Sequence, residues 1–154
     1  MSRLSRLKRL RWGARLRILE ALVYLAAARL ALQVFSFAHL AAFFAHTSPD
    51  RSFGAERAKQ RTNVRWAIRT ACFYLPGVTS CFPQAIAAQA MLRRRGISTV
   101  LYYGATTLST RALKAHVWLQ DGSIGIVGHE IAPDYHIIAQ YPQLAPTALR
   151  QSPG

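Results

Sequence analysis

The amino-acid sequence predicts a single α+β domain in which helices come first and an antiparallel sheet follows. Apolar residues recur at helical spacing as far as Gly96, and beyond it residues 98–103 and 113–120 alternate with a period of two, as strands do. The dipeptide Asp121-Gly122 then leads into a further short strand at 123–127, which is typical of a tight β-hairpin, and we interpret Asp121 as a turn residue. Helices followed by strands are typical of the α+β class.

The first part of the chain is basic and helical. Within residues 2–17, Leu4, Leu7 and Leu10 recur every three residues between basic side chains, which predicts a basic amphipathic helix. Residues 18–45 form a second, more apolar helical region that contains Glu20 and Arg29. These charges favour packing on the domain or docking to a partner over contact with a membrane, although peripheral membrane contact is kept as an alternative.

The remaining segments predict a loop at 47–54, a helix at 55–73 ended by Pro76 and Gly77, and a second helix at 82–95. Gly96 follows three arginines and is expected to end that second helix. We therefore divide the chain into a helical extension at 1–46, a core domain at 47–142 and a loose tail rich in Pro, Gln and Ser at 143–154.

The chain is strongly basic, with a net charge of +14 over 154 residues. Seven of its 20 basic residues lie in the first 17 positions, where there is no acidic residue. Such charge attracts nucleic acid, anionic lipid or acidic proteins without choosing among them. Because the aromatic residues do not interleave with the basic ones on a strand face, we expect no nucleic-acid partner.

Cysteine usage, histidine spacing and the apolar stretches indicate the cellular compartment of the protein and whether it holds a metal ion. The chain has only two cysteines, Cys72 and Cys81, which is too few for a disulfide scaffold and indicates reduced thiols in the cytoplasm. The five histidines are scattered and no CxxC occurs, so we expect no metal site and no cofactor. The interrupted apolar run at 19–32 fits neither a signal peptide nor a spanning helix.

Cys81 is the candidate nucleophile. It follows a Pro-Gly-Val-Thr-Ser segment at the start of a predicted helix, and Pro83 suits the first helical turn. The positive end of a helix dipole stabilises a thiolate, which is the form that attacks a carbonyl. A cysteine at a helix start is more often simply a buried small residue, so catalysis requires a partner base. Cys72 lies between Ala71 and Phe73 inside a helix and is assigned to the core.

His116 is the candidate base. In the predicted strand 113–120, a core face formed by Leu113, Ala115, Val117 and Leu119 alternates with a face formed by Lys114, His116, Trp118 and Gln120. A lone strand histidine is ordinarily an exposed polar residue. A cysteine at a helix start followed 35 residues later by a strand histidine, however, is the order found in papain-like and transglutaminase-like enzymes. Trp118 is placed to shield the pair from water.

Several short runs carry a more specific resemblance. It covers residues 64–142 and rests on Arg65-Trp66-Ala67-Ile68, Ser80-Cys81-Phe82-Pro83-Gln84-Ala85, Met91-Leu92-Arg93-Arg94-Arg95-Gly96-Ile97, Tyr102-Tyr103-Gly104, Ala115-His116-Val117-Trp118-Leu119 and Gly128-His129-Glu130. With these runs the chain resembles the lasso-peptide biosynthesis peptidases, the "B" proteins of the transglutaminase-like superfamily. The Cys helix and the His-Val-Trp strand are the specific parts, whereas the arginine run and the basic opening are weak signals alone.

The resemblance implies a papain-like fold and a leader peptidase. Cys81 would attack the scissile bond of a ribosomally made precursor peptide, with His116 as general base and acid. A separate ATP-dependent cyclase would then close the lasso ring. Some relatives carry a winged-helix leader-recognition domain, for which the helical opening here is too short, so a separate leader-recognition protein is expected. An acyl transferase, or a noncatalytic protein that binds nucleic acid or a membrane surface, is the alternative.

The third catalytic residue departs from the pattern of the superfamily, which usually places an Asp on the strand after the hairpin to orient the histidine. With a turn at Asp121-Gly122, the ideal register pairs His116 with Val127 and puts Gly128 at the expected place of that Asp. Three nearby residues are candidates for the role: Glu130, His129 and Asp134. We favour Glu130, which a bulge near Gly128 would turn toward His116, because a carboxylate also stabilises an imidazolium.

Overall fold

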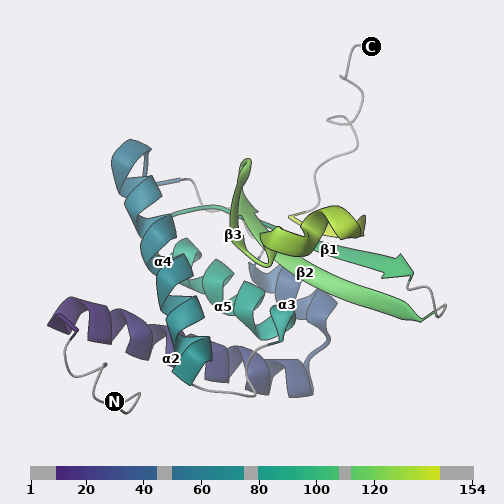
Figure 1. The fold of residues 1–154 in the computed structure, drawn as a ribbon, viewed down its shortest axis with the longest axis horizontal. Helices are drawn as coiled ribbons and strands as arrows, with labels where there is room; N and C mark the ends of the chain where they lie inside the picture. Colours follow the sequence, from purple (N-terminus) through teal and green to yellow (C-terminus); the bar gives the residue numbers. More distant parts are fainter. Residues whose placement is uncertain (1–9, 45–49, 75–79, 108–111, 143–154) are drawn as a thin grey trace.

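The computed structural model describes residues 10–44, 50–74, 80–107 and 112–142, and it confirms the α+β class. In this part of the chain, four helices lie on one face of a four-stranded antiparallel sheet (Figure 1). The helices are α2 (Trp12–Val34), α3 (Phe37–Phe44), α4 (Gly54–Tyr74) and α5 (Cys81–Arg94). Of these helices, none is long and apolar enough to cross a bilayer.

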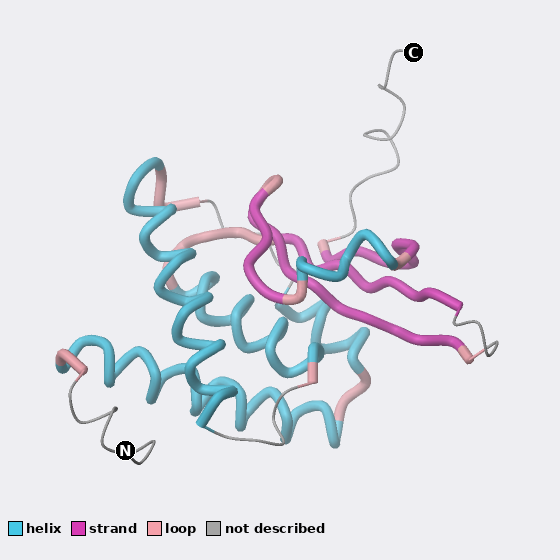
Figure 2. Tube along the Cα trace, in the orientation of Figure 1, coloured by secondary structure: helices cyan, strands magenta, loops and turns pink. Residues whose placement is uncertain are grey.

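The sheet has the strand order β3-β2-β1-β4. Its elements are β1 (Val100–Thr107), β2 (Leu113–Asp121), β3 (Ile124–Val127) and β4 (His136–Tyr141), with the 3₁₀ helix η1 (His129–Asp134) between the last two strands. Figure 2 shows η1 on the side of β2 away from the long helices. β2 therefore lies between two layers, and each of its faces is covered by a different part of the chain.

The helical opening differs from the prediction of two helices that meet near residue 17. α2 runs unbroken from Trp12 to Val34, and the break comes at Phe35, whose backbone is extended. The next helix begins after Ser36, whose hydroxyl accepts a hydrogen bond from the backbone N–H of His39 and so caps α3. The part of the predicted basic helix at 2–9 lies outside the described residues.

The main core lies between the helices and the sheet, with α5 at its centre. The buried residues of α5 run without a gap from Ala85 to Leu92. On the helical side α5 packs against small residues of α2 and α4, and on the other side against Val117 and Leu119 of β2. Small side chains let the three helices approach closely. The helical opening thus shares the core of the rest of the chain, while the boundary expected at residue 46 stays a prediction.

The end of α5 confirms the role predicted for Gly96. Gly96 has a φ of +68°, and its N–H donates to the carbonyl of Arg93 at 2.9 Å. The N–H of Ile97 donates to the carbonyl of Leu92 at 3.1 Å, which completes a Schellman motif. Both ends of α5 are therefore defined within one residue of the predicted bounds.

The hairpin register differs from the prediction. Asp121 pairs with Ile124, so the two-residue loop is Gly122-Ser123, one residue later than expected. Leu119 pairs with Val127 while Gln120 pairs with Gly125, which leaves Ile126 as an extra residue in a β-bulge. Val127 is consequently opposite Leu119 and not opposite His116.

Asp121 is an ion-pair centre, which corrects its interpretation as turn chemistry. Its carboxylate is buried and accepts hydrogen bonds from Arg57 Nη2 at 2.6 Å and Arg61 Nη1 at 2.8 Å. Arg57 also pairs with Asp50 at 2.8 Å. Burial alone would raise the pKa of the Asp121 carboxyl, but the two arginines outweigh it and hold that pKa below its usual range. These contacts tie the hairpin to α4 across about 60 residues of sequence.

We expect Asp121→Asn to lower the free energy of unfolding by about 3 kcal/mol at neutral pH, because it leaves two arginines without their charged partner. The depressed carboxyl pKa stabilises the fold above about pH 4, and this contribution is lost as the pH falls through the folded-state value. The difference between wild type and variant in urea denaturation should therefore shrink in acid. Asp134→Asn, which changes an exposed carboxylate, is the control. A difference that does not depend on pH would contradict the ion-pair explanation.

Candidate active site

Cys81 is the first residue of α5, as the sequence predicted to within one position. Ser80 precedes it as the N-cap with extended backbone, and Pro83 is buried in the first turn. The N-terminal end of α5, which carries the positive end of the helix dipole, therefore lies at the Cys81 thiol. Cys72 is embedded in α4, and burial raises the pKa of its thiol, which leaves Cys81 as the thiol suited to nucleophilic chemistry.

His116 lies on the face of β2 opposite the main core, as predicted, but that face is not open. Its side chain is buried together with that of Trp118. The Trp118 ring lies 6.0 Å from the imidazole and the Tyr135 ring lies 5.0 Å from it. Trp118 and Tyr135 form a second buried cluster with Ala132 of η1. The imidazole thus sits in an aromatic enclosure that η1 completes.

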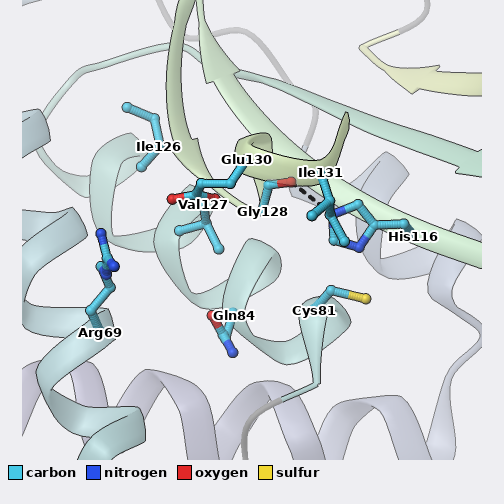
Figure 3. Close-up of a pocket in the computed structure, with 9 residues that line it drawn as sticks. All are labelled: Arg69, Cys81, Gln84, His116, Ile126, Val127, Gly128, Glu130 and Ile131. Atoms are coloured by element: carbon cyan, nitrogen blue, oxygen red, sulfur yellow. Dashed lines mark hydrogen bonds between the residues drawn. The ribbon is translucent and has the colours of Figure 1, made fainter. Parts of the chain in front are cut away.

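The hydrogen bond made by His116 defines which ring nitrogen is available. Its Nε2 lies 2.7 Å from the carbonyl oxygen of Gly128. A carbonyl oxygen can only accept, so Nε2 carries the hydrogen. In the neutral ring Nδ1 then holds the lone pair and is the nitrogen able to take a proton. Figure 3 shows the imidazole between the Gly128 carbonyl and Cys81.

Two features of the backbone require a glycine at position 128. Its φ is +70°, a left-handed conformation that favours glycine. A Cβ at this position would also lie 2.7 Å from the Val117 carbonyl oxygen and 3.1 Å from His116 Nε2. Together with the bulge at Ile126, this residue turns the chain out of β3 and into η1. The same turn brings the Gly128 carbonyl to the imidazole.

Cys81 and His116 line one pocket of about 340 Å³ at the start of α5 (Figure 3). The other lining residues are Arg69, Gln84, Ile126, Val127, Gly128, Glu130 and Ile131. Gln84 lies three positions after Cys81, so both belong to one face of the helix. That spacing was the available signal for Gln84, which the sequence interpretation missed.

The three residues considered for orienting His116 either bind other side chains or are exposed. Glu130 pairs with Arg65 at 3.0 Å, and His129 Nδ1 lies 2.8 Å from Gln120 Nε2. Asp134 is exposed at the end of η1. The contact predicted for Glu130 is made instead by the Gly128 carbonyl, because η1 begins directly after Gly128 and carries the Glu130 side chain toward α4.

Glu130 belongs to a row of charges along α4. Arginines recur there every four residues, at 57, 61, 65 and 69, and so share one helix face. The first two bind Asp121, the third binds Glu130, and the fourth lines the pocket. A hydrogen bond from its own backbone N–H and the charges of Arg65 and Arg69 hold the pKa of the Glu130 carboxyl below its usual range. Glu130 therefore supplies a negative charge at the pocket rim.

Comparison with known proteins gives one result. A family model described as the transglutaminase-like superfamily matches residues 21–140. No curated protein and no solved structure matches the chain. The matched span includes α4, α5 and both candidate residues Cys81 and His116, and it begins inside α2. Within the described residues, no three His, Cys, Asp or Glu side chains converge as metal ligands would.

We expect Gly128→Ala to slow alkylation of Cys81 by iodoacetamide by about 100-fold, because a displaced turn moves the acceptor that positions His116. The rate is measured by mass spectrometry in a Cys72→Ala background. The matched control is Gly122→Ala, which has a similar φ of +59° but open space where the new Cβ would lie, so it carries the conformational cost without the clash. Equal rates in the two variants would show that the Gly128 turn does not position the base.

Proposed function

This chain belongs to the transglutaminase-like superfamily. From that membership we propose that it is a cysteine peptidase, and from the resemblance of its motifs we propose that it removes the leader from a lasso-peptide precursor. The observation that carries the proposal is the shared pocket of Cys81 and His116, in which Nε2 is bound to Gly128 and Nδ1 is left as the base. The superfamily includes cysteine peptidases and transglutaminases, which share the thioester intermediate. The leader-peptidase role is supported by the sequence resemblance alone.

The proposed reaction is acyl transfer to water. Nδ1 of His116 takes the Cys81 proton, and the sulfur attacks the scissile carbonyl carbon to form a tetrahedral intermediate. The imidazolium gives its proton to the departing amine, which breaks the C–N bond and leaves a thioester. Nδ1 then takes a proton from water, whose oxygen attacks the thioester. The leader leaves as a carboxylic acid and the thiol is restored.

The surroundings of the pair support this chemistry. The Gly128 carbonyl keeps the imidazole in one tautomer through both proton transfers. The backbone N–H groups at the start of α5, which have no acceptor within the helix, and the side-chain amide of Gln84 in the pocket lining are the proposed donors to the developing oxyanion. Trp118 and Tyr135 limit the access of water to the imidazole.

The pocket also suits a peptide substrate. The exposed Ile131 supplies apolar contact, while Arg69 and Glu130 place opposite charges in the same lining. An extended leader segment offers both side chains and backbone groups to such a mixed surface. The proposed partners are the precursor peptide, a separate leader-recognition protein and an ATP-dependent cyclase.

We expect Cys81→Ala to abolish cleavage of a co-expressed precursor, as followed by mass spectrometry, while Cys72→Ala retains it. His116→Ala should be as inactive as Cys81→Ala, and the double variant no worse, because residues that act as one unit are not additive. Cleavage by the Cys81→Ala protein would end the peptidase assignment. A product that carries an added amine in place of a carboxylic acid would show acyl transfer instead of hydrolysis.

Glu130→Gln tests which group orients His116. A catalytic carboxylate would cost about 10²–10⁴-fold in rate when neutralised. Because Glu130 binds Arg65 and Nε2 is held by Gly128, we expect the cleavage rate to fall far less than that. Arg65→Gln removes the other half of the ion pair and should give a similar small effect. A loss in the carboxylate range for Glu130→Gln alone would restore Glu130 as the orienting residue.

A further inference from the structure

α2 is apolar on two opposite faces, and only one of them is buried. Its buried stripe consists of Ile18, Ala21, Leu25 and Ala28. Its other face carries what we call the outer seam, formed by Trp12, Leu16, Leu19, Val23, Leu30 and Val34. Each seam residue is more than half exposed, so none is buried by the described part of the chain. Figure 1 shows α2 at the outer border of the helical layer. A continuous apolar stripe along a helix is normally buried against another element.

The spacing of the residues in the outer seam indicates the kind of element that would pack on it. From Trp12 to Leu30 the residues follow alternating steps of four and three, once Ala26 is counted between Val23 and Leu30. This is the a and d pattern of a heptad repeat. At 100° per residue the seam residues fall within about 60° of one another, which is the narrow stripe of a helix–helix contact. The seam extends for about 33 Å along α2, long enough for a partner helix of six turns.

The surface beside the seam is recessed. A hollow of about 430 Å³ lies where α2 meets the last turn of α5, and its lining includes Leu16, Leu19 and Val23 of the seam. Tyr24 lines this hollow and also a second one of about 220 Å³, which is bounded by Leu40 and Phe43 of α3. Side chains of a facing helix would find room along this margin, as knobs do in holes.

The charge of α2 indicates the kind of partner protein. Residues 11–34 carry four arginines and a single acidic residue, Glu20, which is already paired with Arg94 and Arg95. A second copy would bring the same basic helix, and the whole chain has a net charge of +14, so self-pairing is opposed by like charge. We propose that the outer seam is the docking site for an amphipathic helix of an acidic partner protein. This surface is independent of the proposed peptidase reaction.

The test uses the full chain and two synthetic four-heptad peptides. Both have Leu at a and d, and they carry either Glu or Lys at e and g. Fluorescence anisotropy should show that the Glu peptide binds, that its affinity falls with added salt, and that the Lys peptide does not bind. The double variant Leu16→Gln/Val23→Gln should weaken binding of the Glu peptide by at least about tenfold. Ile137→Gln/Ile138→Gln changes two comparably exposed apolar residues on β4 and should leave binding unchanged.

Several results would overturn the proposal. One is failure of the Glu peptide to bind the wild type. Another is equal affinity of the Glu peptide for the wild type and for the seam variant, and a third is equal affinity of the wild type for the Glu and Lys peptides. If vesicles containing phosphatidylglycerol bound the wild type but not the seam variant, while the Glu peptide did not bind, the seam would be a membrane contact. Self-association in sedimentation velocity that the seam variant lost would make a second copy the occupant. Circular dichroism confirms that each variant is folded.

Discussion

The burial of α5 between the other helices and the sheet is the constraint on which the rest of this structure depends. Its side chains are buried from Ala85 to Leu92, so the helix cannot rotate or slide without opening the core. The Schellman motif at Gly96 ends α5, and its buried length then places Cys81 at the mouth of the pocket. The candidate nucleophile is thereby held on a rigid element, although its own side chain is only half-buried.

The candidate base, His116, is positioned by a backbone carbonyl. A bulge and one left-handed glycine turn the chain so that Gly128 accepts the hydrogen bond from His116. A neutral carbonyl selects the tautomer as a carboxylate does, but it stabilises an imidazolium less, since charge-assisted hydrogen bonds are about twice as strong. The site therefore relies on enclosure by Trp118 and Tyr135 more than a carboxylate-based triad would.

The arginine row on α4 links fold and site. Arg57 and Arg61 hold the end of β2 through Asp121, and Arg65 holds η1 through Glu130. The strand that carries the imidazole and the 3₁₀ helix that follows its acceptor Gly128 are thus both attached to α4. Breaking the partly exposed Glu130 pair should cost little stability, whereas removing one partner from the buried Asp121 cluster should cost much more, because it leaves an uncompensated buried charge. The outer seam of α2 lies on the helical layer, where docking leaves this assembly intact.

The sequence by itself determined the α+β class, the bounds of α5 and the face of β2 that carries His116. Those features follow from local periodicity and from the glycine after Arg95, which act within a few residues. Tertiary structure alone decided that Gly128, and not Glu130, meets His116, and that Asp121 binds α4. A single bulged residue reverses which side chains face the site, and partners 60 residues apart leave no local pattern. The second apolar face of α2 is equally a tertiary result, because periodicity marks apolar residues without saying which of them the fold covers.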